Sequence, residues 1–392
     1  MKQTHSTPPT QGLDLVDVRL RLGRWYDEHA RALPWREDVS AYHVLLSEII
    51  LQQTRVDQGM AYYHRFTERF PTVHDLAAAS EDEVLLLWQG LGYYSRGRNL
   101  RRAAQIIVSD FGGEIPRTPE GLSRLPGVGP YTRGAILSFA YNLPYPTVDG
   151  NVFRVLSRLF GTTDPIDTTQ GARIYWALAE ALLDTAHPSR HNQAVIELGA
   201  LCCTPRRPNC TECPIALHCL AHRAGIEEEL PIKQGKTKVL PRFMYYFLVR
   251  LPLASGGEGL LIRRRGAGDI WQGLYELPLI ETGEKGITIE ELTAHPDFCE
   301  LLSTLERPTF HPTPIATHAH RLSHRQIQAT LFLLEAEGLR TPSPYLTIPT
   351  EERTAYAFPV LTDKLGGGFA FGIFFLCMVG QLFWVLKVMP ET

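Results

Sequence analysis

Apolar side chains recur at three- and four-residue intervals over residues 13–225, which is the spacing of amphipathic helices. Val44, Leu45 and Ile49 illustrate this spacing. Short breaks rich in Pro and Gly separate the segments, at 70–72, 112–113, 126–127, 144–146 and 188–189. The pattern predicts a mainly α-helical region, with helices at 118–124 and 131–141 on either side of a glycine-containing turn.

The pattern changes after residue 240. Residues 243–251, 259–263 and 330–335 form apolar runs between loops rich in Gly, Ser and Pro, which is typical of β-strands. We therefore expect an α+β domain over 241–365. The charged stretch 226–240 has no periodicity and is predicted to be a linker. Residues 1–12 are polar, lack the apolar core of a signal peptide and are predicted to be a disordered leader.

An apolar tail, 366–392, follows the α+β domain. Residues 369–388 approach the ~20 residues that a helix needs to cross a bilayer. Three interpretations remain open: a membrane tether, an apolar helix packed on the domain, and an altered reading frame. The membrane tether is not the favoured one.

Composition and charge narrow the class of protein. The chain has 392 residues, of which 21% are charged, and a net charge of −3. These values exclude a disordered, collagen-like or polytopic membrane protein. They also exclude a uniformly basic nucleic-acid binder, so any contact with DNA must come from a local patch.

Four of the seven cysteines lie close together, at Cys203, Cys210, Cys213 and Cys219. A disulfide scaffold would spread them, so the cluster favours a reducing, cytoplasmic location and a metal site. Four thiolates at the spacing C-x6-C-x2-C-x5-C suit either tetrahedral zinc or an iron–sulfur cluster. Cys202 is then a spare thiol, packed in the preceding helix.

A second motif lies in the turn between the two predicted helices. Gly127 and Gly129 form a G-x-G turn whose backbone N–H groups can hold a DNA phosphate without reading sequence. Taken alone, a plain helix–helix turn explains it better. About 20 residues later, Asp149 is placed to cap the N-terminus of another helix.

These motifs together resemble the MutY family of adenine DNA glycosylases, in the helix–hairpin–helix superfamily that includes endonuclease III. The likeness covers roughly 13–365. It rests on LSEIILQQT at 46–54, GLGYY at 90–94, LPGVG at 125–129, VDGN at 148–151 and the cysteine loop at 203–219. The resemblance implies a [4Fe–4S] cluster on the four cysteines. It also implies a monomer that acts on double-stranded DNA containing an A:8-oxoguanine or A:G mismatch.

The resemblance assigns four catalytic residues. Glu48 would protonate the adenine and later position water, and Asp149 would stabilise the oxocarbenium-like sugar. Asn151 would orient these groups. Tyr131 occupies the position of the lysine that forms a Schiff base in bifunctional relatives, so we expect a glycosylase that does not cut the strand. From its sequence context alone, Glu48 would sooner be an exposed helical glutamate.

Further positions follow from the same resemblance, each with core packing or surface exposure as the alternative. The adenine pocket would include Arg31, Trp35, Leu51 and Gln193. Gln53 and Tyr93 would lie near the opposite, damaged base, where a side chain fills or wedges the stack.

The α+β domain resembles the MutT-like, Nudix-fold domain with which this family recognises 8-oxoguanine. The R-E-x-x-E-E carboxylates of Nudix hydrolases are absent from the sequence, which argues against pyrophosphatase activity. Ser323 and His324 match the recognition loop, but Leu322 stands where the family usually has Phe. The alternative is an ordinary polar loop between strands.

Two rival functions remain. One is a thymine- or uracil-mismatch glycosylase, which shares the helical fold but has no MutT-like domain. The other is a non-catalytic protein that binds DNA lesions, against which the presence of both Glu48 and Asp149 argues.

Overall fold

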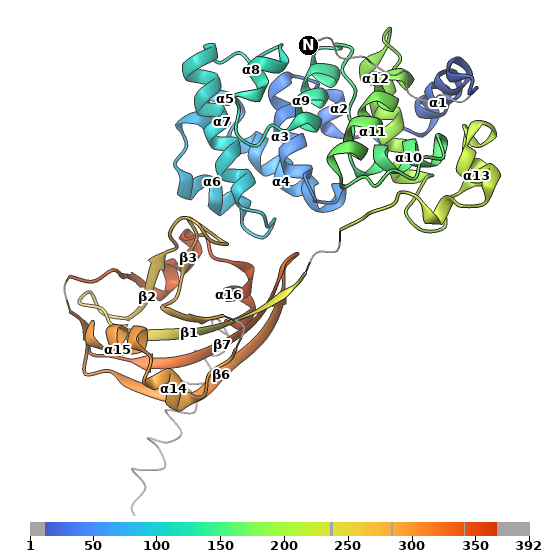
Figure 1. Ribbon diagram of the computed structural model, residues 1–392. Helices are drawn as coiled ribbons and strands as arrows, with labels where there is room; N and C mark the ends of the chain where they lie inside the picture. Colours follow the sequence, from blue (N-terminus) through green and yellow to red (C-terminus); the bar gives the residue numbers. More distant parts are fainter. Residues whose placement is uncertain (1–11, 236–237, 284, 341, 367–392) are drawn as a thin grey trace, which may run out of the picture. The chain divides into compact units, whose positions relative to one another are not determined.

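The computed structural model describes residues 12–235, 238–283, 285–340 and 342–366, and its contacts form two compact units (Figure 1). The helical unit comprises the described residues of 1–79 and 96–236, and the sheet unit those of 80–95 and 237–392. The predicted leader, except for Gly12, and the apolar tail beyond Gly366 lie outside the described residues. Within the described part of the chain, no helix is long and apolar enough to cross a membrane.

The helical unit consists of short helices joined by turns, as the apolar spacing predicts. Its α-helices are α1 Leu15–His29, α2 Pro34–Glu37, α3 Ala41–Leu51, α4 Val56–Arg69, α5 Val73–Ala78, α7 Ser95–Phe111, α8 Pro119–Ser123, α9 Pro130–Ala135, α10 Gly150–Leu159, α11 Thr169–Leu182, α12 Pro188–Leu201 and α13 Leu220–Ala224. A π-helical turn, η1 Ile136–Ala140, continues α9. Short 3₁₀ turns follow in the cysteine region, at η2 Cys210–Glu212, η3 Ala216–His218 and η4 Glu227–Glu229.

Local sequence explains how α10 forms. Asp149 accepts a hydrogen bond from the backbone N–H of Val152 at 2.8 Å, so the predicted N-cap is confirmed. The apolar face of α10 then packs Val155 and Leu156 against α11 and α12 in one buried cluster. The cap therefore determines where α10 begins. The buried apolar face determines how α10 packs against α11 and α12.

Part of the predicted linker is packed on the helical unit. Leu230 is only 3% exposed, and its carbonyl accepts a hydrogen bond from Nε of Arg158 at 3.2 Å. The backbone N–H groups of Gln234 and Gly235 both donate to Asp167. Residues 226–235 therefore belong to the fold of the helical unit, although their sequence has no periodicity.

The sheet unit contains a mixed sheet in the order β3-β2-β1-β7-β6, with β4 paired to β1 and β9 paired to β2. The β1–β7 pair is parallel, and the other pairs of this sheet are antiparallel. The strands are β1 Leu240–Pro252, β2 Glu258–Arg264, β3 Tyr275–Glu276, β4 Leu279–Thr282, β6 Thr309–Arg321, β7 Arg325–Glu335 and β9 Leu346–Pro349. A small second sheet pairs β5 Leu305–Glu306 with β8 Gly338–Leu339.

Both faces of the central sheet are covered. Met244 and Tyr246 of β1 face a core that includes α16 Val360–Leu365, whereas Tyr245 and Phe247 face α14 Ile289–Thr293 and α15 Pro296–Ser303. Burial on both faces explains the continuous apolar run by which β1 could be predicted. The sheet unit also contains a 3₁₀ turn, η5 Thr350–Ala355. The helix α6 Glu81–Trp88 belongs to the sheet unit as well, although the residues of α6 fall within the predicted helical region.

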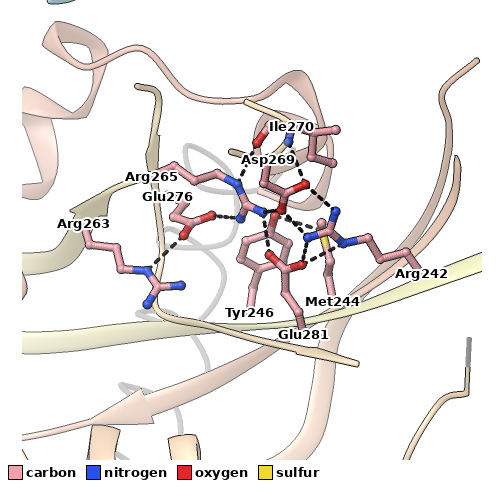
Figure 2. A network of polar contacts seen from close by, with 9 residues as sticks. All are labelled: Arg242, Met244, Tyr246, Arg263, Arg265, Asp269, Ile270, Glu276 and Glu281. Carbon is pink, nitrogen blue, oxygen red and sulfur yellow. Dashed lines mark hydrogen bonds and ion pairs between the residues drawn. The ribbon is translucent and has the colours of Figure 1, made fainter. Parts of the chain in front are cut away.

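A network of charged side chains, in which Arg265 and Glu276 are buried, lies in the sheet unit (Figure 2). Arg265 is 8% exposed and donates to Glu276 at 2.5 Å and to Glu281 at 2.7 Å. Glu276, at 1% exposed, also accepts from Arg263 at 2.9 Å. Asp269 and Arg242 complete this set, and the six residues are called the C-terminal charge network: Arg242, Arg263, Arg265, Asp269, Glu276 and Glu281.

Candidate active site

A cavity of about 940 Å³ opens in the helical unit, and most of the predicted site residues line it. Three helices bring the proposed catalytic groups together, because α3 carries Glu48, α9 carries Tyr131 and Asp149 caps α10. The other predicted residues on its wall are Arg31, Trp35, Leu51, Gln53, Gly127, Gly129, Asn151 and Gln193.

Glu48 is buried in the wall of this cavity, with 8% of its surface exposed. The alternative of an exposed helical glutamate is therefore wrong. Ser40 caps α3, and the apolar neighbours of Glu48, Ile49 and Ile50, enter the core. Burial raises the pKa of Glu48 to about 7, and this outweighs the hydrogen bond with Tyr131, which lowers it. A carboxyl in this range can hold a proton at neutral pH and still release it.

Tyr131 is the hydrogen-bonding partner of that carboxyl. Burial, with the nearby charge of Glu48 second, raises the pKa of Tyr131 well above its ordinary value. The phenol therefore stays neutral and keeps a proton to donate. Gly129 precedes α9 in extended backbone and Pro130 begins it, which aims this first turn of the helix at the cavity.

Asp149 faces the cavity with both carboxylate oxygens engaged. Its Oδ1 accepts from the N–H of Val152, and its Oδ2 accepts from Nδ2 of Asn151 at 2.9 Å. Burial raises the pKa of Asp149, although these hydrogen bonds act in the opposite direction. Asn151 in turn accepts from Nη2 of Arg154 at 2.8 Å, which fixes the orientation of its amide.

Arg36, Gln52 and Thr132 also line this cavity, although no sequence motif indicated them. Nε2 of Gln52 donates to the carbonyl of Gly127 at 3.3 Å and to Thr132 at 3.2 Å, which ties the end of α3 to the glycine turn. Glu197 binds Arg31 and Arg36. Hydrogen bonds from these two arginines outweigh the effect of burial and lower the pKa of Glu197 to about 2. No local sequence signal indicates Glu197, because the arginines that bind it lie far away in the chain.

Gln53 and Tyr93 both have left-handed backbone, with φ of 55° and 46°. Gln53 lines the cavity and is exposed. Nη1 of Arg96 donates to the carbonyls of Ile49 and Ile50 and so secures the end of α3 before this turn. Tyr93 is 48% exposed and belongs to the sheet unit.

The predicted recognition loop lies between β6 and β7, where Ser323 and His324 are exposed. Oγ of Ser323 lies 3.2 Å from Nδ1 of His324. The N–H of Leu322 donates to the carbonyl of Arg325 at 2.8 Å, which closes a tight turn. The side chain of Leu322 packs against the apolar core of the sheet unit. Ser323 and His324 are thus exposed polar groups in the turn between β6 and β7.

The four predicted cysteine ligands converge on one small cavity beside α10 and α13. Nη1 of Arg158 lies 3.3 Å from Sγ of Cys203 and donates to the carbonyl of Thr204 at 2.8 Å. Burial, and then neighbouring charges, raise the pKa of Cys210 to about 12 and that of Cys219 to about 11. Thiols crowded in this way suit a cationic metal group, which would balance their charge as thiolates.

Three other residues with possible metal-binding side chains line this small cavity: Cys202, His222 and Glu227. Cys202, at the C-cap of α12, is 6% exposed and lines the same cavity as the four predicted ligands. His222 and Glu227 lie within reach of Cys210, so the site also holds donors other than sulfur.

Comparison with known proteins places both units. Residues 46–180 match the HhH-GPD superfamily of base excision DNA repair proteins, and residues 251–366 match a NUDIX domain. Adenine DNA glycosylase of Rattus norvegicus is 36% identical over 386 residues, which cover 84% of this chain and 73% of the rat protein. The chain belongs to the adenine DNA glycosylase family.

Other members of the adenine DNA glycosylase family show similar coverage. The Homo sapiens enzyme is 34% identical, over 87% of this chain and 70% of its own length. A solved structure of a thermostable thymine-DNA glycosylase aligns at 26% identity with a TM-score of 0.50. That alignment covers 97% of the thymine glycosylase but only 54% of this adenine glycosylase family member. This chain has an additional NUDIX match, and the thymine-glycosylase rival was predicted to have no such domain. The protein is therefore a DNA glycosylase with a mainly helical region and an α+β domain.

Proposed function

We propose that the protein hydrolyses the N-glycosidic bond of adenine mispaired with 8-oxoguanine or guanine in double-stranded DNA. The observation that carries the proposal is a buried carboxyl, Glu48, whose pKa is raised to about 7 at the wall of a cavity that also holds Asp149. A volume of about 940 Å³ is ample for one flipped nucleotide.

Bond cleavage begins with proton transfer to the leaving base. Protonated Glu48 donates to N7 of the flipped adenine, so that the bond between sugar and base breaks as the purine accepts the bonding electrons. The ionised Asp149 stabilises the positive charge that forms on the sugar. Glu48, now a carboxylate, accepts a proton from the attacking water, and this returns the acid to its starting state.

Tyr131 and Asn151 hold the two acids in position. The Tyr131 phenol is neutral and hydrogen-bonds Glu48, and the Asn151 amide donates to Asp149. Because a phenol cannot form an imine with the sugar, the proposal includes no strand cleavage. Trp35 and Leu51 supply apolar surface for the adenine ring, and Gln193 supplies an amide for its polar edge.

Discrimination of the opposite base is assigned to Ser323 and His324. Their exposure at the tip of the β6–β7 hairpin supports this role. 8-oxoguanine differs from guanine by a new acceptor and a new donor, and a hydroxyl with an imidazole can pair with both. Gln53, at the rim of the cavity, is proposed to support the distorted stack.

We further propose that Cys203, Cys210, Cys213 and Cys219 hold a [4Fe–4S] cluster. When bound, the cluster would cross-link the loop after α12 and compensate the crowded thiolates. Arg158 supports the site from α10 through its contacts with Cys203 and Thr204. Iron and sulfide analysis of anaerobically purified protein tests this; zinc in their place would overturn it.

The decisive experiment compares single-turnover base release from three duplexes containing A:8-oxoguanine, A:G or T:G. We expect adenine release from the first two, with the first faster, and no thymine release. Release of thymine would favour the mismatch-glycosylase rival. Binding of the A:8-oxoguanine duplex without release of any base would favour a non-catalytic lesion-binding protein.

A further inference from the structure

A fully buried carboxylate on α12 joins two arginines of the cavity wall. Oε1 of Glu197 accepts from the backbone N–H of Arg31 at 2.9 Å and from its Nε at 2.7 Å. Oε2 accepts from Nη2 of Arg31 at 2.9 Å and from Nη2 of Arg36 at 2.8 Å. The Glu197 side chain is 0% exposed, whereas that of Arg31 is 34% exposed and that of Arg36 is 15% exposed.

The segment that carries the arginines depends on this carboxylate. The helix α2 has only four residues, and Leu33 at its N-cap makes no side-chain hydrogen bond. Arg36 has two further contacts, a hydrogen bond from Nη1 to the carbonyl of Arg31 at 3.0 Å and a position 5.7 Å from the ring centre of Tyr26. Glu197 is therefore the group that ties both arginines to a long, well-packed helix.

This contact also determines the charge that Glu48 meets. The two arginines line the cavity, and together with Glu197 they carry one net positive charge. The groups that face Glu48 are Tyr131 on α9, Asp149 before α10 and Arg36 on α2. The remaining charged residues of the cavity lining are Arg31, Arg55 and Asp57. Asp149 favours the protonated form of Glu48, and Arg36 favours its ionised form.

We propose that Glu197 is a positioning residue that clamps Arg31 and Arg36 into the cavity wall and thereby fixes the balance of charge around Glu48. The inference rests on the proposed role of Glu48 as the acid. The physical basis of the proposal is that Arg31 and Arg36, held in place and partly neutralised by Glu197, need not rearrange when the base enters the cavity. The clamp keeps the acid protonated at neutral pH because it offsets part of the positive charge nearby.

The test is the pH dependence of single-turnover adenine release by Glu197→Gln. The substitution keeps the shape of the side chain and removes its negative charge. Arg36 keeps its contacts with Arg31 and Tyr26, so that its charge acts on Glu48 with less compensation. Because the acid must be protonated, release falls as pH rises through its pKa. The midpoint of this fall should move about one unit to lower pH.

For Arg36→Gln we predict a shift of the pH midpoint in the opposite direction. This variant tests the proposal if Glu197→Gln does not fold. Loss of the positive charge should move the midpoint to higher pH. Glu197→Asp retains the charge and should restore the wild-type midpoint, even if release is slower. A purely structural role would slow release without moving the midpoint in Glu197→Gln or Arg36→Gln, and that result would overturn the proposal.

Glu276→Gln is the matched control, because it removes a buried carboxylate from arginine partners in the sheet unit. Its midpoint should equal that of the wild type. Carbon-13 NMR titration of the Glu48 carboxyl reads the same shifts without turnover. If the wild type released no adenine, the proposed function would fail, but the NMR titration would still test the role of Glu197. An unchanged Glu48 midpoint in both Glu197→Gln and Arg36→Gln would overturn that role.

Discussion

The cavity of the helical unit and the C-terminal charge network both contain buried carboxyl groups, but the hydrogen-bonding partners of these carboxyl groups differ. In the network, Arg263 and Arg265 hydrogen-bond the buried Glu276, and a hydrogen bond from Arg242 is the main cause of the lowered pKa of Asp269, which is exposed. In the cavity, no arginine among the described residues hydrogen-bonds Glu48 or Asp149, and burial raises both pKa values.

The difference shows which buried charges hold the fold and which are available for chemistry. A carboxylate paired with arginines is stabilised as the anion and cannot serve as an acid near neutral pH. A carboxyl whose partners are a phenol, an amide and a helix N-terminus remains poised between its two forms. Glu197 belongs to the first class, although the two arginines that it binds line the cavity of the second.

The largest expected effect follows from removing the acid. Glu48→Gln should lower single-turnover adenine release by ~10²–10⁴-fold, which is the usual contribution of general acid catalysis. Binding to the A:8-oxoguanine duplex should be nearly unchanged, because the amide fills the same space. A rate within tenfold of the wild type would remove Glu48 from the mechanism.

Removing a network carboxylate should instead affect stability. Glu276→Gln leaves Arg263 and Arg265 without their shared partner, and breaking such a buried pair typically destabilises a fold by about 3–5 kcal/mol. Denaturant unfolding followed by tryptophan fluorescence measures the change. Wild-type stability in this variant would show that the network is not what holds the sheet unit together.

The same comparison predicts that the wild-type acid destabilises the fold at high pH. The pKa of Glu48 is near 7 when folded and about 4.5 in the unfolded chain. Above pH 7 the folded protein must ionise a buried group, so Glu48→Gln should be more stable than the wild type by about 3 kcal/mol at pH 8. The advantage should shrink as pH falls from 7 to 4.5 and vanish below that. Urea unfolding at pH 8 and pH 5 measures it, and an equal difference at both values would contradict the account.

A smaller effect is expected at the hairpin tip. Replacing Ser323 and His324 together with Ala should reduce the preference for A:8-oxoguanine over A:G, because each lost hydrogen-bonding group is worth ~1–3 kcal/mol. Adenine release from A:G should largely persist. An unchanged preference would move recognition of the lesion to the helical unit, with Gln53 as the next candidate.

Much of the fold could be predicted because local patterns determine it. The amphipathic spacing indicates α3, the Asp149 cap marks the start of α10, and burial on both faces makes β1 a continuous apolar run. The strand β6 could not be predicted, because it is an edge strand with mostly exposed residues and two prolines. Its partners, not its own pattern, make it a strand.

The site was predictable only where motifs carry it. Glu48, Tyr131 and Asp149 lie in recognisable segments, and the structure brings them to one cavity. Glu197 was not found, since its partners lie more than 160 residues earlier in the chain and no local pattern marks a buried ion pair. The burial of Glu48 could not be read from its helix either, because several helices together exclude water from it.

The measurement that tests the central claim most directly is a carbon-13 NMR titration of the Glu48 carboxyl in the wild-type protein, assigned by comparison with Glu48→Gln. The account predicts a midpoint near 7, because burial without an arginine partner disfavours the carboxylate. A midpoint at or below 4.5 would show that Glu48 is ionised at neutral pH and would contradict its role as the acid.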